Sequence, residues 1–249
     1  MVTKINKLSQ LYASVLINSI YSMKNYPVTL VNTLMSPLSI LVIITLVSRG
    51  ALLSVSVSGA LIMTMVTAGI GLQADLSHLK NDFKVQDMVV SSPTSAATYM
   101  LGMALSEIVF VIPTLLVLAI LAVLFVHTSI MGAITIVAVM SLMFVFSISL
   151  GFFLSTYSTD VIQNYAFIGM LSILLTTIPP VYYPITYIPM PYRYIAYLSP
   201  TTYAAEITQS AIGYLQLPVQ MLVLDWAVII AIALALLVIS VKKSRWREV

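Results

Sequence analysis

The stretch IVFVIPTLLVLAILAVLFVHTSIMGAITIVAVMSLMFVFSISLGFFLSTYST, residues 108–159, decides the fold class of this chain. Its 52 residues contain no Asp, Glu, Lys or Arg, and they lie between Glu107 and Asp160. About 20 consecutive apolar residues are enough for one helix to cross a bilayer, so this stretch is long enough for two crossings. Residues 227–234, AVIIAIAL, do not alternate between apolar and polar as a β-barrel strand does. We therefore predict an all-α polytopic membrane protein.

The composition of the whole chain agrees with this prediction. Of its 249 residues, 60% are hydrophobic and 8% are charged, and the mean hydropathy is +1.06. A soluble domain carries about 25% charged residues, so the solvent for most of this surface is lipid. The chain has no cysteine, which excludes disulfides, thiolate metal sites and cysteine nucleophiles.

Similar apolar runs on both sides of the central stretch predict a six-helix bundle. Its spans are Pro27–Val47, Ala51–Leu72, Tyr99–Val126, Ile130–Leu154, Val161–Pro180 and Val219–Val241. With a cytoplasmic N-terminus, nine of the eleven Lys and Arg residues lie inside, and only Arg49 and Arg193 lie outside. This positive-inside bias predicts that both termini, including the tail 242–249, are cytoplasmic.

Residues 1–26 are predicted to form an amphipathic helix at the membrane interface. Their apolar residues recur at helical spacing with polar residues between them, rather than in the continuous run of a cleavable signal. We favour a helix that also contacts a partner, and a simple topogenic anchor is the alternative.

Two connections are unlike plain linkers. The first, residues 73–98, has 26 residues, whereas helix hairpins need about 2–8. A Ser-Ser-Pro sequence at 91–93 is a helix-start pattern, so a short surface helix and a docking role are expected there. The second begins after the fifth span: residues 178–200 hold six of the eleven prolines and six of the fourteen tyrosines. Because prolines end helices and tyrosines favour the interface, we predict an outer re-entrant helical segment over 181–217.

These two connections resemble parts of the permease subunits of type-2 ABC exporters. The sequence VVSSP at 89–93 is followed by YMLG at 99–102, as in the coupling helix of that family and the start of its third helix. VYYP at 181–184 and PTTY at 200–203 resemble the outer segment that precedes the last helix. The chain departs from many members at 81–87, which lacks a Gly-Thr and an acidic–basic pair, and at Met103, where many have lysine.

The resemblance implies a membrane subunit that docks onto separate ABC ATPase subunits, two copies per transporter, in the plasma membrane of a prokaryote. A second permease chain, as homodimer or heterodimer, and membrane lipid complete the expected partners, with no nucleic acid. The chain contains no Gly-x-x-x-x-Gly-Lys-[Ser/Thr] motif, so no cofactor is expected on it, and ATP and Mg would bind the partner ATPase. The residues expected to dock the ATPase are Asp87, Met88, Val89, Val90, Ser91, Ser92, Pro93 and Thr94.

The residues predicted to act in translocation or gating are Glu107, Tyr182, Tyr183, Pro184 and Glu206. An ionisable residue inside a membrane helix, such as Glu107, is a functional candidate by default. Glu206 and Asp225 are also expected to pair with Arg193 as structural residues. Because the longest run has no charge, the expected substrate is amphipathic, drug-like or lipid-linked.

Two other classes of function stay open, an ion-coupled secondary carrier and a non-transporting assembly factor. An intramembrane enzyme is disfavoured because the chain has no His-Glu-x-x-His motif and no Gly-x-Ser-Gly nucleophile. Small residues in the second span, over 54–59 and 68–71, indicate close helix contacts, either in a dimer seam or within the chain.

Overall fold

The chain folds as a bundle of long helices in a computed structural model that describes residues 7–81, 95–157 and 161–243. Helices account for 84% of the chain, and the described residues contain no strand. The all-α polytopic membrane fold predicted from the sequence is therefore confirmed.

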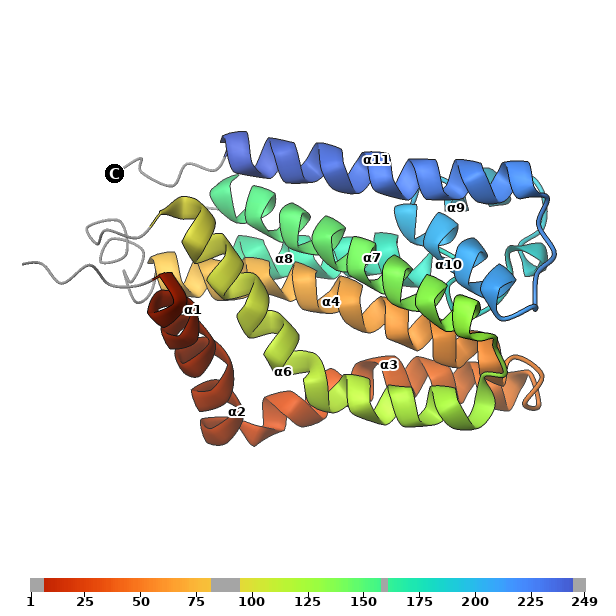
Figure 1. Cartoon of the computed structure of the whole chain (residues 1–249), viewed down its shortest axis with the longest axis horizontal. Helices are drawn as coiled ribbons and strands as arrows, with labels where there is room; N and C mark the ends of the chain where they lie inside the picture. Colours follow the sequence, from red (N-terminus) through yellow and green to blue (C-terminus); the bar gives the residue numbers. More distant parts are fainter. Residues whose placement is uncertain (1–6, 82–94, 158–160, 244–249) are drawn as a thin grey trace, which may run out of the picture.

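The elements follow one another along the chain as Figure 1 shows. They are α1 (Lys7–Val15), a π-helical segment (Leu16–Tyr21), α2 (Ser22–Asn25), α3 (Pro27–Val47), α4 (Leu53–Asn81), α6 (Ala96–Phe125), α7 (Ile130–Tyr157), α8 (Val161–Ser172), a π-helical turn (Ile173–Thr177), a 3-10 turn (Ile185–Tyr187), α9 (Arg193–Ala196), α10 (Pro200–Ala211) and α11 (Val219–Lys243). We call the end of the bundle that holds α1 the terminal end, and the opposite end the α10 end (left and right in Figure 1).

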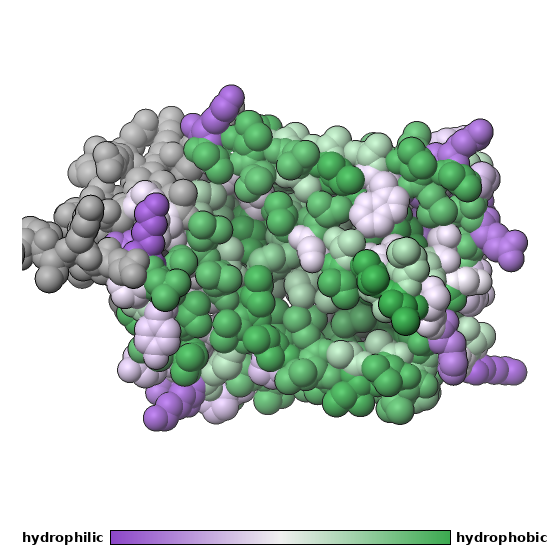
Figure 2. Space-filling model, viewed as in Figure 1, coloured by the Kyte–Doolittle hydropathy of each residue, from purple (hydrophilic) through white to green (hydrophobic). Residues whose placement is uncertain are grey.

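Five helices are long and apolar enough to cross a membrane. These are α3, α4, α6, α7 and α11. The fifth predicted span is shorter than expected, because its apolar helix covers only Ile162–Thr177 before Pro179 and Pro180. Apolar residues cover most of the face in Figure 2, and the hydrophilic residues lie toward its two ends, as expected of a protein whose middle faces lipid.

Helix α4 forms the centre of the bundle. In its most apolar window 89% of the residues are buried, against 11–44% in the other four spans. Its most extensive partner is α7, and the two backbones approach closely at two glycines. A Cβ at Gly151 would lie 2.5 Å from the carbonyl oxygen of Gly69, and a Cβ at Gly69 would meet Ser147. Packing within the chain therefore explains the small residues at these positions.

Helix α4 is longer than the span expected from the sequence, which ended at Leu72. Residues 73–81, assigned to the first connection, continue the helix to Asn81. Gln73 of this extension is fully buried, and its Nε2 donates a 2.7 Å hydrogen bond to Oδ1 of Asn164 in α8. This hydrogen bond satisfies one atom of each buried amide, whereas Gln73 Oε1 and Asn164 Nδ2 have no hydrogen-bond partner among the described residues. At its other side, the connection ends where Ser95 caps α6 by accepting a hydrogen bond from the backbone N–H of Thr98.

Helix α6 bends in its middle (Figure 1), where it contains Pro113. Proline removes one helical hydrogen bond and crowds the preceding turn, which bends the helix axis. The first half of α6 lies beside α1, and the second half runs along α3.

The N-terminal segment forms α1, the π-helical segment and α2, as a nearly continuous helical arm. The arm packs on α6 at the terminal end. There the side chain of Ser14 fills the space that a Cβ at Gly102 would need, and Asn18 donates a hydrogen bond to the sulfur of Met103. Its other face is exposed, with Leu8 at 74% and Tyr12 at 65%. The arm is thus helical with one free apolar face, as an interface helix requires.

Candidate functional site

A cavity of about 400 Å³ lies between the N-terminal arm, α3, α4, α6 and α8. This volume is within the usual range for small-molecule sites. Its lining residues are Asn18, Ser22, Thr29, Asn32, Thr33, Ser36, Thr67, Ala68, Ile70, Gly71, Asp75, Glu107, Phe110, Val111, Ile168 and Ser172.

One side of the cavity is polar because α3 presents a polar face to it. Thr29, Asn32, Thr33 and Ser36 are spaced by three and four residues, which places them on one side of the helix. The other helices contribute apolar groups such as Phe110 and Ile168, together with polar ones such as Thr67 and Ser172. An amphipathic molecule would therefore find both polar and apolar contacts in this cavity.

Two carboxyl groups line the cavity, Asp75 from α4 and Glu107 from α6. The two side chains are joined by a hydrogen bond. Because a carboxylate only accepts hydrogen bonds, this contact requires a proton on at least one of the two groups. The pair together then carries at most one negative charge. Glu107 was a candidate from the sequence, whereas Asp75 was assigned to a connection.

A second, small void of about 20 Å³ lies deeper in the bundle. Ser36 and Thr67 line both spaces, and Thr176 and Tyr182 close the small one toward the α10 end. The cavity and the void thus follow each other along α3 and α4, and Tyr182 lies at the far end of the void.

The segment that holds Tyr182 is fixed firmly against α4 and α10. Ser56 donates a 3.1 Å hydrogen bond to the carbonyl of Tyr182, and Gln209 donates 3.2 Å bonds to the carbonyls of Pro180 and Tyr183. Tyr182 is only 3% exposed and Pro184 is also buried, whereas Tyr183 is half-buried. The three residues expected to gate a path therefore lie in the packed core of the α10 end.

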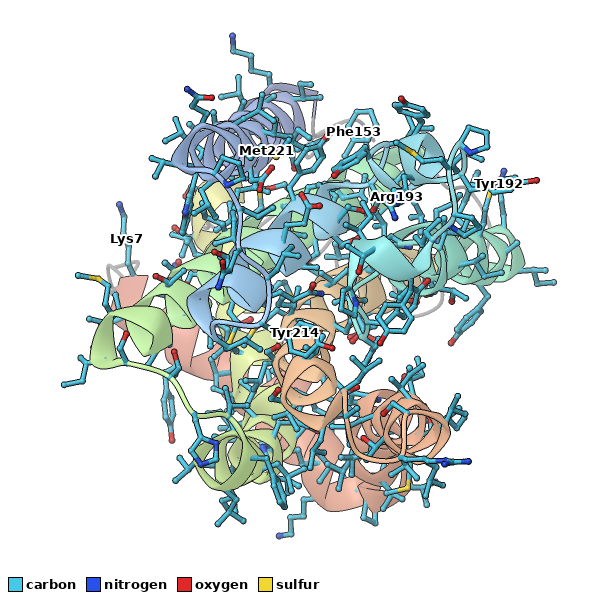
Figure 3. The ribbon with its side chains drawn as sticks, turned by 90° about the vertical axis from the view of Figure 1, so that its right-hand side faces the viewer. Lys7, Phe153, Tyr192, Arg193, Tyr214 and Met221 are labelled. Atoms are coloured by element: carbon cyan, nitrogen blue, oxygen red, sulfur yellow. The ribbon has the colours of Figure 1, made fainter. Side chains whose placement is uncertain are left out.

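Glu206 is buried in α10 and accepts a 2.9 Å hydrogen bond from the hydroxyl of Tyr197. Burial raises the pKa of Glu206, and the Tyr197 hydrogen bond opposes that effect. The expected pairing with Arg193 is wrong, since that guanidinium donates to the carbonyls of Ile188 and Thr186. Figure 3, which looks at the α10 end, shows Arg193 among the segments of that end. Asp225, the other expected partner, is buried in α11.

The ATPase-docking residues expected at 87–94 lie outside the described residues, so their contacts stay predictions. Within the described residues, the polar face of α3 was not predicted. Its polar residues recur every three or four positions in the first predicted span, but the high mean hydropathy of that span indicated only a lipid-spanning helix.

Comparison with known protein families identifies the family of this chain. The sequence profile described as ABC-2 type transporter matches residues 10–212, from the N-terminal arm to the end of α10. No individually curated protein matches the chain. Membrane domains of this family are the non-catalytic transmembrane components of ABC transporters and generally partner with ATPase subunits. The chain is a multi-pass membrane protein that belongs to the ABC-2 type transporter family, as a transmembrane ABC permease.

Proposed function

We propose that this permease is the membrane subunit of an ATP-driven exporter of amphipathic, drug-like or lipid-linked molecules. The observation that carries the proposal is the cavity between α3, α4, α6 and α8 in a chain of the ABC-2 family. A lining with both polar and apolar side chains suits a substrate that has both kinds of surface. The chain contains no P-loop motif, so a separate ATPase supplies the energy.

Export requires a path from the cavity to the opposite side of the membrane. The small void beyond Ser36 and Thr67 supports a route along α3 and α4 that ends under Tyr182. Movement of the segment around Tyr182 would open this route, and the hydrogen bonds from Ser56 and Gln209 would hold it closed at rest.

The direction of transport depends on the side that each end of the bundle faces. In our proposal the terminal end is cytoplasmic, in agreement with the positive-inside bias. A membrane-impermeant maleimide on intact cells tests this orientation, because the native chain has no cysteine. The thiol introduced by Tyr192→Cys, at a side chain 61% exposed at the α10 end, should react, and one introduced by Lys24→Cys should not. The reverse pattern would overturn the proposed direction.

Coupling to the ATPase is proposed to pass through residues 87–94. The test is purification of the tagged chain from gently solubilised membranes, followed by identification of co-purified proteins and an ATPase assay. We expect a Walker-type ATPase with the native chain, and its loss or uncoupling in the variant Val90→Asp/Ser91→Asp.

A matched control carries the same two added charges at the other end of the bundle. Met190→Asp/Tyr192→Asp changes two side chains that are 62% and 61% exposed there, so it should retain the ATPase. A native chain that purifies intact, alone and without ATPase activity would refute the proposal and favour a carrier or an assembly factor.

A further inference from the structure

We propose that the cavity recognises a cationic amphiphile, whose single positive charge is bound by the carboxyl pair of Asp75 and Glu107. This inference deepens the proposed function and rests on it for the identity of the site as a transport cavity. It assigns the ligand class, an organic monocation with an apolar body.

The first argument is the charge of the lining. Asp75 and Glu107 are the two ionisable side chains that line the cavity, and no Lys or Arg is among the described lining residues. The hydrogen bond between the two carboxyl groups requires at least one proton, so the pair carries at most one negative charge. A monocation neutralises that charge without release of the proton, whereas an anion would meet repulsion.

The second argument is the distribution of polar and apolar groups around the pair. The N-terminal arm contributes Asn18 and Ser22 to the lining, and these side chains offer hydrogen bonds but no charge. Phe110 lies one helical turn beyond Glu107 on α6 and lines the same cavity, so an apolar body can extend along it. A cationic group at the pair and an apolar body toward Phe110 and Ile168 would use both walls.

The third argument is that the site has an opening next to a kink. Pro113 lies six residues after Glu107, and the bend directs the first half of α6 toward the N-terminal arm. The side chain of Asp75 is exposed, and it lines the cavity together with that of Glu107.

The test measures binding of tetraphenylphosphonium to the purified full chain in detergent by equilibrium dialysis. We expect saturable binding, and at least about 10-fold weaker binding of tetraphenylborate, an anion of the same shape. Asp75→Asn/Glu107→Gln removes the charge at nearly constant volume and should weaken cation binding about 10- to 100-fold, as expected for loss of a charged contact.

Two further variants serve as controls. Asp75→Glu/Glu107→Asp keeps both carboxyl groups and should bind the cation within about 3-fold of the native chain. Asp225→Asn removes a buried acid from α11, which does not line the cavity, and should also retain binding. Equal binding of cation and anion by the native chain would overturn the inference, and this measurement does not depend on the folding of any variant. No cation binding, or native affinity in the folded Asp75→Asn/Glu107→Gln chain, would do the same.

The outcomes separate this inference from the proposed function. Because the dialysis uses the permease without its ATPase, loss of cation selectivity would leave the ATPase coupling intact. Conversely, selective cation binding by a chain that recruits no ATPase would refute the exporter and leave the cation site standing.

Discussion

Gly59 of α4 is the position where one added methyl group should disturb the segment that closes the α10 end. An ideal Cβ there would lie 2.9 Å from the carbonyl carbon of Val181 and 3.3 Å from Cα of Tyr182, and closer still to the Val181 oxygen. The obstructing atoms belong to backbone, which cannot rotate away as a side chain would. Gly59→Ala must therefore push residues 181–182 away from α4.

The expected cost follows from these contacts. Overpacking of a tight core costs about 1–3 kcal/mol. The displaced segment also strains the 3.1 Å hydrogen bond from Ser56 to Tyr182, whose loss costs about 1 kcal/mol. The total is about 2–4 kcal/mol. Replacing glycine by alanine in a helix gains up to about 1 kcal/mol, and Gly71→Ala in the same helix isolates that gain because nothing lies within 4 Å of its Cβ.

The assay compares thermal melting of the two variants by tryptophan fluorescence in detergent. Gly59→Ala should melt about 5–15 °C below Gly71→Ala, on the scale of about 2–4 °C per kcal/mol for a chain of this size. A thiol introduced by Val181→Cys, at a side chain only 1% exposed, should also react faster with maleimide in the Gly59→Ala background. Equal melting temperatures and equal labelling rates would refute the proposed contact between α4 and this segment.

Two further predictions concern buried polar pairs. Gln73→Leu alone should lower the free energy of unfolding by about 1–3 kcal/mol because it leaves the amide of Asn164 buried without its partner. Gln73→Leu/Asn164→Leu should recover most of that stability. A double-mutant cycle of melting measurements checks this, and additive losses of stability would contradict it. Burial raises the pKa of Glu206 above its ordinary value of 4.5, so the folded chain keeps a proton that the unfolded chain has lost. Stability should therefore fall as pH rises from about 4.5 through the raised pKa of Glu206. Melting curves taken from about pH 4.5 to 8 test this expectation. Glu206→Gln should flatten the fall in stability with pH, and Tyr197→Phe should extend it to higher pH because it removes the hydrogen bond that stabilises the Glu206 carboxylate. An unchanged pH profile in both variants would contradict the raised pKa of Glu206.

Hydropathy predicted the long helices well because lipid imposes a simple requirement. The first span, Pro27–Val47, has the same limits in the sequence prediction and in the structure, and the last begins at Val219 in both. A helix in hydrocarbon satisfies its own backbone groups, so the length of the apolar run determines the element without knowledge of its neighbours. The fifth span was overestimated at its end, since apolar residues continue to Ile178 although the helix ends at Thr177, before the prolines.

The packing role of small residues was not decidable from the chain alone. A glycine at 69 suits a dimer seam and a contact within the chain equally well, because both need a close approach of backbones. The structure assigns it to the contact with α7, where Ser147 and Ile148 occupy the space that a side chain would need. Gly71, two residues later, faces the cavity instead. Residues so close in sequence take different roles because a helix turns by about 100° per residue.

The carboxyl pair was not predicted because the second span was expected to end at Leu72, before Asp75. With a connection beginning at residue 73, Asp75 belongs to a surface loop while Glu107 lies inside the membrane, and the two have no reason to meet. In the structure α4 continues to Asn81 and α6 begins at Ala96. Asp75 is then about 9 Å from the end of its helix and Glu107 about 16 Å from the start of its own, at 1.5 Å per residue. The two helices are antiparallel neighbours and α6 is bent, so these depths are close enough for the side chains to meet. The continuation of α4 beyond Leu72 places a carboxyl group at the cavity, and composition alone does not predict that placement.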